Sequence, residues 1–212
     1  MRVVVGSGSS RDFRQVELDR HLQMMSRFVE QAPSESPQSL SFTMILRSAR
    51  SGPAQALIGM KDDLMQAGVI AKVILAKLEP EEDVRQLFAC LSELGPREPA
   101  AELIRWARNP RLLDAHEQVT YGDTMCWSGD AMRRDADKRN GLTLFDEAAP
   151  DTVRLGRLAF EALWAASTLV PERRLLGPVT ARPSGAYQPA QESAVGVSPL
   201  RPSFQGWPLV RH

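Results

Sequence analysis

His116 and Gln118 are the residues whose spacing best suits chemistry on a phosphodiester. They stand two positions apart in a predicted strand, so their side chains point to the same side of a sheet. A histidine is a usable nucleophile toward phosphorus if neighbouring groups neutralise the charge that builds on the phosphoryl oxygens. The alternative interpretation is a structural histidine whose tautomer is fixed by Asp123 or Asp114.

Arginines that follow His116 in the sequence supply positive charge for the same chemistry. Arg133 and Arg134 stand out because guanidinium groups bind phosphate in a bidentate manner. They are suited to an isolated phosphate group or to the backbone of a polynucleotide. The alternative is a solvated loop in which Asp135 and Asp137 offset the arginine charges.

The segment from His116 to Asp130 resembles the signature of the phospholipase D superfamily, H-x-K-x4-D followed by a turn of the type G-S-x-N. His116 and Asp123 match the histidine and the aspartate, whereas Gln118 stands where the signature has lysine. Ser128 and Asp130 fall near the serine and the asparagine of the turn, although the connection is shorter. The resemblance covers roughly residues 1–170, which corresponds to one half of a two-motif enzyme.

The resemblance implies a site in which His116 is the catalytic nucleophile and Asp123 belongs to the catalytic motif. The residues expected to contact the phosphate are Gln118, Ser128, Asp130, Arg133 and Arg134. A glutamine keeps a hydrogen-bond donor but lacks the charge of the lysine, and charge-assisted hydrogen bonds are roughly twice as strong as neutral ones. We therefore expect the motif to be catalytically degenerate.

The three histidines of the chain bear on its assembly, since family members use two. His21 lies in a predicted helix and His212 is the last residue, so a second catalytic histidine has to come from His116 of a second copy. We therefore expect a homodimer that binds a phosphorylated ligand or nucleic acid and acts as a regulator. One alternative is an active phosphodiesterase or nuclease that uses His116 across the homodimer. Another is a non-catalytic scaffold that binds a protein partner through its C-terminal tail.

Other motifs give no support for a cofactor or a metal. Gly6-Ser7-Gly8 follows a predicted strand, but Arg11 occupies the third glycine position of a dinucleotide fingerprint. Cys90 and Cys126 match no zinc or redox spacing, and we expect them to be buried thiols. We therefore expect no cofactor and no metal site.

Apolar periodicity and the Gly and Pro positions predict alternating strands and helices. Strands are expected at 2–5, 41–46, 69–78, 102–107, 112–121 and 124–127, with a short helix as the alternative at 102–107. Helices are expected at 13–31, 53–67, 81–94 and 152–169. The alternation predicts an α/β domain over residues 1–174, built as a mostly parallel β-sheet flanked by helices on both faces. This is the architecture that a phospholipase D-like half implies.

The composition is that of a globular protein. The 212 residues are 43% hydrophobic and 25% charged, and the zero net charge argues against a surface coated in positive charge for nucleic acid. Residues 175–212 are rich in proline and lack aliphatic periodicity, so we expect a disordered tail. The N-terminus lacks the pattern of a signal peptide and no segment is apolar enough to span a bilayer, so we expect a cytoplasmic protein without membrane contact.

Overall fold

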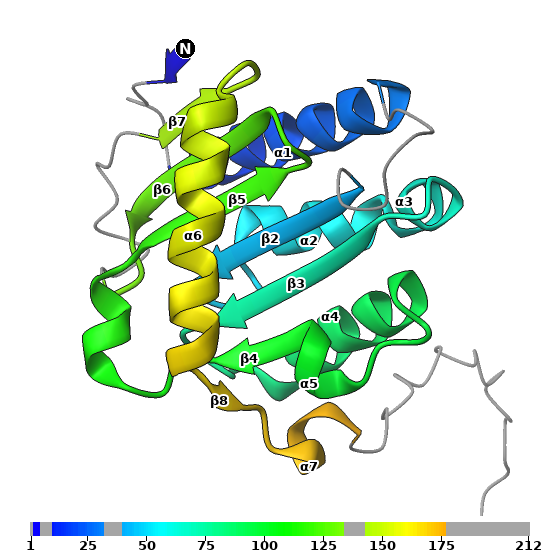
Figure 1. The fold of residues 1–212 in the computed structure, drawn as a ribbon, viewed down its shortest axis with the longest axis vertical. Coiled ribbons are helices and arrows are strands. Elements are labelled where there is room, and N and C mark those ends of the chain that lie inside the picture. The colour runs from blue at the N-terminus through cyan, green and yellow to red at the C-terminus, as the bar shows by residue number, and fades with distance from the viewer. Residues whose placement is uncertain (1, 5–9, 32–39, 134–142, 177–212) are drawn as a thin grey trace, which may run out of the picture. The chain divides into compact units, whose positions relative to one another are not determined.

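The computed structural model of the protein describes residues 2–4, 10–31, 40–133 and 143–176 (Figure 1). Eight strands in this part of the chain form one sheet in the order β1-β7-β6-β5-β2-β3-β4-β8. Their bounds in chain order are β1 Arg2–Val4, β2 Ser41–Leu46, β3 Ile70–Leu75, β4 Ile104–Trp106, β5 His116–Tyr121, β6 Met125–Ala131, β7 Thr143–Asp146 and β8 Thr168–Leu169. The pairs β2–β3 and β3–β4 are parallel, and the other neighbouring pairs are antiparallel.

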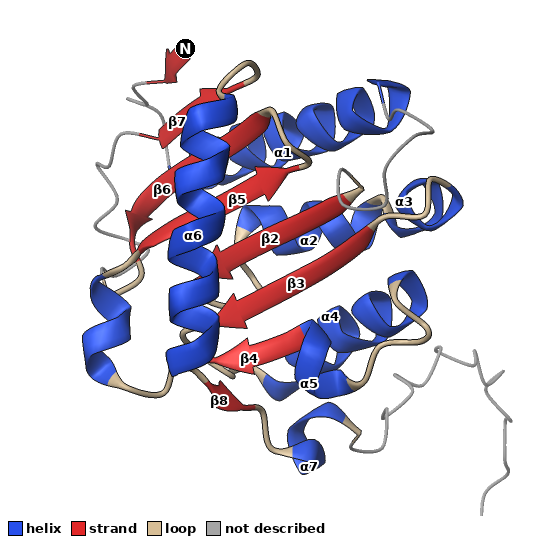
Figure 2. Ribbon diagram, in the orientation of Figure 1, coloured by secondary structure: helices blue, strands red, loops and turns tan. Residues whose placement is uncertain are grey.

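Helices cover both faces of this sheet (Figure 2). The helices on one face are α1 (Ser10–Gln31), α2 (Gly52–Gly59), α3 (Lys61–Gln66) and α4 (Glu81–Leu94), and α6 (Pro150–Ala166) crosses the other face. Strand alternation supplies a core on each side: Met44 and Leu46 pack toward α1–α4, whereas Ile45 packs toward α6. Within the described residues, no helix combines the length and the apolar character needed to cross a membrane.

The expected α/β domain, with a sheet flanked by helices on both faces, is confirmed. Parallel pairing is confined to β2, β3 and β4, whose successive members are linked by helices. β5 and β6 are joined by residues 122–124 alone, and so short a connection permits only an antiparallel pair. Gly122 has φ 58° in this turn, a conformation that favours glycine. The sheet as a whole is therefore mixed.

Several boundaries differ from those expected from the sequence. The predicted helix 53–67 is divided at Met60 into α2 and α3. The predicted strand 102–107 begins as the short helix α5 (Ala100–Leu103), and the predicted strand 112–121 begins inside the 3-10 helix η1 (Pro110–Asp114). A further short helix, α7 (Glu172–Leu175), spans the predicted end of the domain at residue 174. The tail beyond residue 176 lies outside the described residues, so its disorder stays a prediction.

Candidate functional site

His116 lies at the start of β5, and its side chain is exposed. Since β5 runs antiparallel to β2, this start lies at the edge of the sheet where β2 and β3 end. The His116 Nδ1 atom is 2.9 Å from the carbonyl oxygen of Gly129. A carbonyl can only accept, so Nδ1 carries the hydrogen and Nε2 is left with a free lone pair. The geometry gives His116 the tautomer that a nucleophile needs.

Gln118 lies on β5 beneath α6, where its amide is half-buried. A Cβ atom added at Gly156 of α6 would stand only 2.2 Å from Gln118 Nε2. The glycine therefore makes room for the glutamine amide, which packs against the helix backbone. A lysine side chain at this position would have to fit its longer stem and its charge beneath α6.

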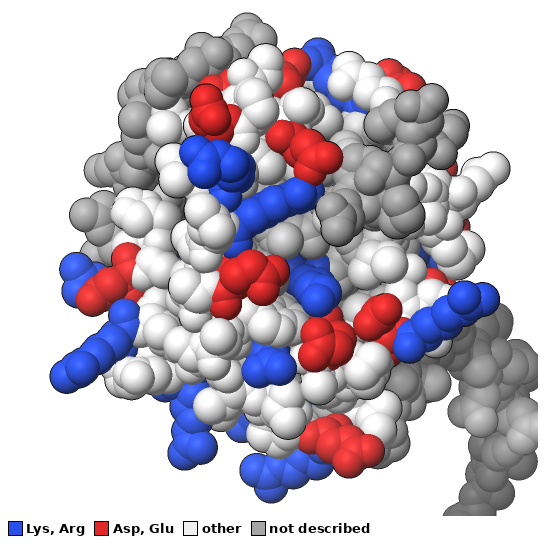
Figure 3. All heavy atoms as spheres, in the orientation of Figure 1, with Lys and Arg blue, Asp and Glu red and all other residues white. Residues whose placement is uncertain are grey.

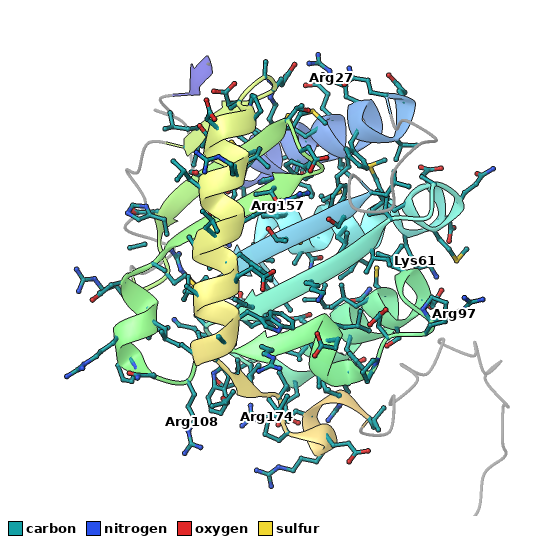
Figure 4. The ribbon with its side chains drawn as sticks, viewed as in Figure 1. Arg27, Lys61, Arg97, Arg108, Arg157 and Arg174 are labelled. Carbon is teal, nitrogen blue, oxygen red and sulfur yellow. The ribbon has the colours of Figure 1, made fainter. Side chains whose placement is uncertain are left out.

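Asp123 lies in the turn at the opposite end of β5 from His116. A strand rises about 3.3 Å per residue, so the two side chains are separated by roughly 20 Å. Asp123 Oδ1 forms an ion pair with Nη1 of Arg157 at 2.6 Å, and Nη2 of the same arginine donates to the carbonyl of Gly122 at 2.9 Å (Figure 4). Asp123 thus fastens the turn to α6.

The remaining residues expected at the phosphate come from β6 and from the segment that follows it. Ser128 is opposite Gln118 on β6, and Asp130 Oδ1 accepts a hydrogen bond from the backbone nitrogen of Ala131 at 2.8 Å. Arg133 is exposed and pairs with Asp114 at 2.8 Å. Arg134 lies outside the described residues. The expected site residues that the structure describes are therefore distributed along β5, β6 and their flanking turns.

Glu117, between the two motif residues, is a buried carboxylate that sequence reasoning missed. It is 0% exposed and accepts hydrogen bonds from the backbone nitrogen of Arg47 at 2.9 Å and from Ser51 Oγ at 2.8 Å. Arg47 Nη2 lies 3.4 Å from Glu117 Oε2, and its guanidinium also donates to the carbonyls of Ala131 and Met132. This network fixes the loop after β2 against β5 and β6.

A cavity of about 600 Å³ lies beside this network, at the ends of β2 and β3 and the start of α2. Its charged lining consists of four cations and two carboxylates, which are Arg14, Arg47, Arg50, Lys77, Glu17 and Glu79. Clefts outside the carboxyl ends of parallel strands are the usual ligand sites of open α/β sheets. A sequence feature that could have indicated this site is the polar loop of residues 47–52. It follows an apolar strand and precedes a helix that has proline at its start.

The charges around the cavity are only partly neutralised. Arg50 Nε is 2.5 Å from Asp83, and Glu79 is 3.2 Å from Arg174. Lys77 is exposed and forms no ion pair with any residue that the structure describes. Ser51, at the start of α2, makes no side-chain cap because its hydroxyl donates to Glu117. Counted together with the ion-pair partners Asp83, Glu117 and Arg174, the lining has an excess of one positive charge, to which the N-terminal end of α2 adds.

His21 forms a second buried polar contact, behind the sheet. Its Nδ1 is 2.5 Å from the hydroxyl of Tyr121, and its ring packs edge-on against Trp127 with centroids 4.8 Å apart. Burial lowers the pKa of His21 to about 3 and raises the pKa of Tyr121. The tyrosine therefore donates to a neutral histidine, and we assign this pair a role in stability.

Cys90 and Cys126 are buried free thiols, as expected from the sequence, and burial raises the pKa of each to about 11. Their protonated state at neutral pH makes them poor nucleophiles and poor metal ligands. Among the described residues, no group of three or more His, Cys, Asp or Glu side chains is placed to hold a metal ion.

Comparison with protein-family models gives no match, and comparison with curated proteins gives none either. Among solved structures, the chain is similar to TrmBL2, an archaeal chromatin protein, with a TM-score of 0.46 and 15% identity over 80% of this chain. The match spans 54%, about half, of the TrmBL2 chain. The chain is also similar to Nuc, a phospholipase D family member from Salmonella typhimurium, with a TM-score of 0.38 and 13% identity over 68% of this chain and 88% of Nuc.

Proposed function

We propose that the domain binds a phosphorylated small molecule in the cavity beside Arg47 and does not turn it over. The observation that carries this proposal is the surplus of positive charge in a cavity of about 600 Å³ at the carboxyl ends of β2 and β3. A phosphate group matches this surplus, and the remaining volume suits the rest of a small ligand.

The cations of the cavity differ in how they serve this role. Arg47 is held by Glu117, so its position is fixed before a ligand arrives. Lys77, just beyond the end of β3, and Arg14, in the first part of α1, also line the cavity, and both residues are exposed. A cation that is held in place before binding, with the exposed Lys77 in the same lining, is suited to the capture of an anion.

The positions of His116, Gln118 and Asp123 support binding without catalysis. His116 is exposed at one end of β5, Gln118 is beneath α6, and Asp123 is paired with Arg157 at the other end. A catalytic site needs its nucleophile and its charge-stabilising groups around one reacting atom.

Calorimetric titration with inorganic phosphate and with AMP tests this proposal. We expect Lys77→Gln to weaken binding of both probes about tenfold, the value of one charge-assisted hydrogen bond. Arg97→Gln, a matched loss of one exposed positive charge beyond the end of α4, is the control and should bind as wild type does (Figure 4). No binding of either probe by wild type, or equal losses in the two variants, would remove the proposal.

Titration with a single-stranded oligonucleotide at two salt concentrations separates a small ligand from nucleic acid. A polynucleotide held by several cations loses affinity steeply with salt because counterions are released. Tighter binding of the oligonucleotide than of AMP, with a steep salt dependence, would favour the nucleic-acid form of the proposal.

A second candidate is phosphodiester cleavage with His116 as nucleophile across a homodimer. The observation that favours it is the bond from Nδ1 to Gly129, which leaves Nε2 of an exposed imidazole as an acceptor. In this candidate Arg133 or Arg134 replaces the charge of the missing lysine, with Ser128 and Asp130 shaping the turn. Hydrolysis of a chromogenic phosphodiester that is abolished in His116→Ala would support it, and unchanged turnover in that variant would exclude it.

A further inference from the structure

The outward face of α6 is apolar along most of its length. Leu155 and Leu158 are each 59% exposed, and Leu169, just beyond the helix, is 56% exposed. The residues that α6 turns to the sheet are instead Val153, Gly156, Phe160 and Trp164. Figure 3 shows charged groups over the first turns of this helix and beside its middle, and uncharged side chains over much of the rest.

The spacing makes these residues one continuous stripe. Leu155, Leu158 and Ala162 follow one another at intervals of three and four, so they lie on the same side of the helix, and Ala165 extends the row. Leucine side chains stand beside alanines, which leave shallow depressions between them. Contiguous exposed apolar surface of this kind marks a contact surface in a protein that is otherwise well packed.

We propose that α6 packs antiparallel against α6 of a second copy of the chain, about a two-fold axis at Leu158. In such a pair, positions before Leu158 lie opposite partner positions that follow Leu158 by a similar distance, to within one residue or about 1.5 Å along the helix axis. Leu158 then meets Leu158 of the partner subunit, and Leu155 lies against the partner's Ala162. Each large side chain is matched with itself at the axis or with a small one away from it.

The charges on the flank of the stripe are arranged for the same pairing. Arg154 and Glu161 lie on one side of the row, four residues before and three residues after Leu158. The antiparallel arrangement brings Arg154 opposite the partner's Glu161, and the two-fold axis forms this contact twice. Within one chain, Arg154 reaches only Asp151, at 4.0 Å, and Glu161 has no ion pair with any described residue.

A self-complementary surface of this kind favours a second copy of the chain over an unrelated partner. An unrelated partner would not require opposite charges before and after Leu158 in the sequence. The stripe lies on the face of the sheet opposite the cavity, since the cavity is lined by α1, α2 and the loops after β2 and β3. The pairing therefore leaves the cavity open, and it is independent of the proposed phosphate binding.

Sedimentation equilibrium of the full chain at micromolar concentration tests the pairing. Wild type should sediment as a dimer, and Leu158→Asp should raise the dimer dissociation constant at least about 100-fold, because two buried leucines are lost. The control is Met65→Asp on α3, which replaces another exposed apolar residue, 48% exposed, and should leave the dimer intact. Circular dichroism should show both variants folded, since both side chains lie on the surface.

A charge exchange tests the register. Glu161→Arg should weaken the dimer about tenfold, because it faces the partner's Arg154 with a like charge. Combining it with Arg154→Glu restores opposite charges and should restore the wild-type dissociation constant. A monomeric wild type, or a dimer that Met65→Asp disrupts and Leu158→Asp does not, would overturn the pairing. A double variant as weak as Glu161→Arg alone would overturn the antiparallel register.

Discussion

Acidification from pH 7 to pH 5 should destabilise the domain through His21. The side chain is 0% exposed, and its burial lowers the pKa to about 3 from the ordinary value of 6.5. Below pH 6.5, His21 therefore binds a proton in the unfolded chain but stays neutral in the folded chain. Stability is lost as the pH falls through 6.5 toward 3, and it is fully retained above 6.5.

The two pKa values give the magnitude. A tenfold difference in proton affinity between the folded and the unfolded chain corresponds to about 1.4 kcal/mol. At a given pH, the free energy of unfolding is reduced only for the pH range between that pH and the unfolded-state pKa of 6.5. Integration from pH 7 to pH 5 gives a loss of about 2 kcal/mol in the free energy of unfolding. Such a loss is a large share of the 5–15 kcal/mol that is typical of a domain.

Urea unfolding of wild type and His21→Gln at pH 7, 6 and 5 isolates this contribution from other titrating groups. The variant should be less stable at pH 7, since it loses the bond to Tyr121. Its deficit should shrink by about 2 kcal/mol at pH 5, because only wild type carries the histidine penalty. His116→Gln, at an exposed histidine, should follow the wild-type profile. A His21→Gln curve parallel to wild type from pH 7 to pH 5 would refute the assignment of a neutral buried histidine.

Two further changes test the packing near the site. Gly129→Ala should lower the free energy of unfolding in urea by about 1–3 kcal/mol, because its Cβ would stand 2.6 Å from the rigid ring of Trp127. The control is Gly59→Ala on α2, whose Cβ would meet nothing closer than 3.8 Å and should not lower the stability. Equal effects of the two alanines would contradict this packing. Glu117→Gln should cost about 3 kcal/mol, because it leaves the charge of buried Arg47 without its carboxylate, and a loss below about 1 kcal/mol would show that the pair contributes little.

Elements whose signals are local could be predicted from the sequence. β2 and α4 have the bounds predicted for them. β2 is specified by a short apolar run between polar residues, and α4 is bounded by Pro80 and Gly95. The division of the helix at Met60 and the four-residue strand β7 were not predicted. Both features are too short to show a periodic pattern of apolar residues. β7 forms a strand because it pairs with β1 and β6.

The candidate site depends on contacts between segments that are far apart in the sequence. Linear spacing drew attention to His116, Gln118 and Asp123, but an extended strand holds its two ends apart, and α6 covers its middle. Arg47 and Glu117 are 70 residues apart in the sequence, and they meet because β5 pairs with β2 at the centre of the sheet. Strand order depends on which apolar faces bury one another across the whole domain, so no local pattern reveals the charged cavity that this order creates.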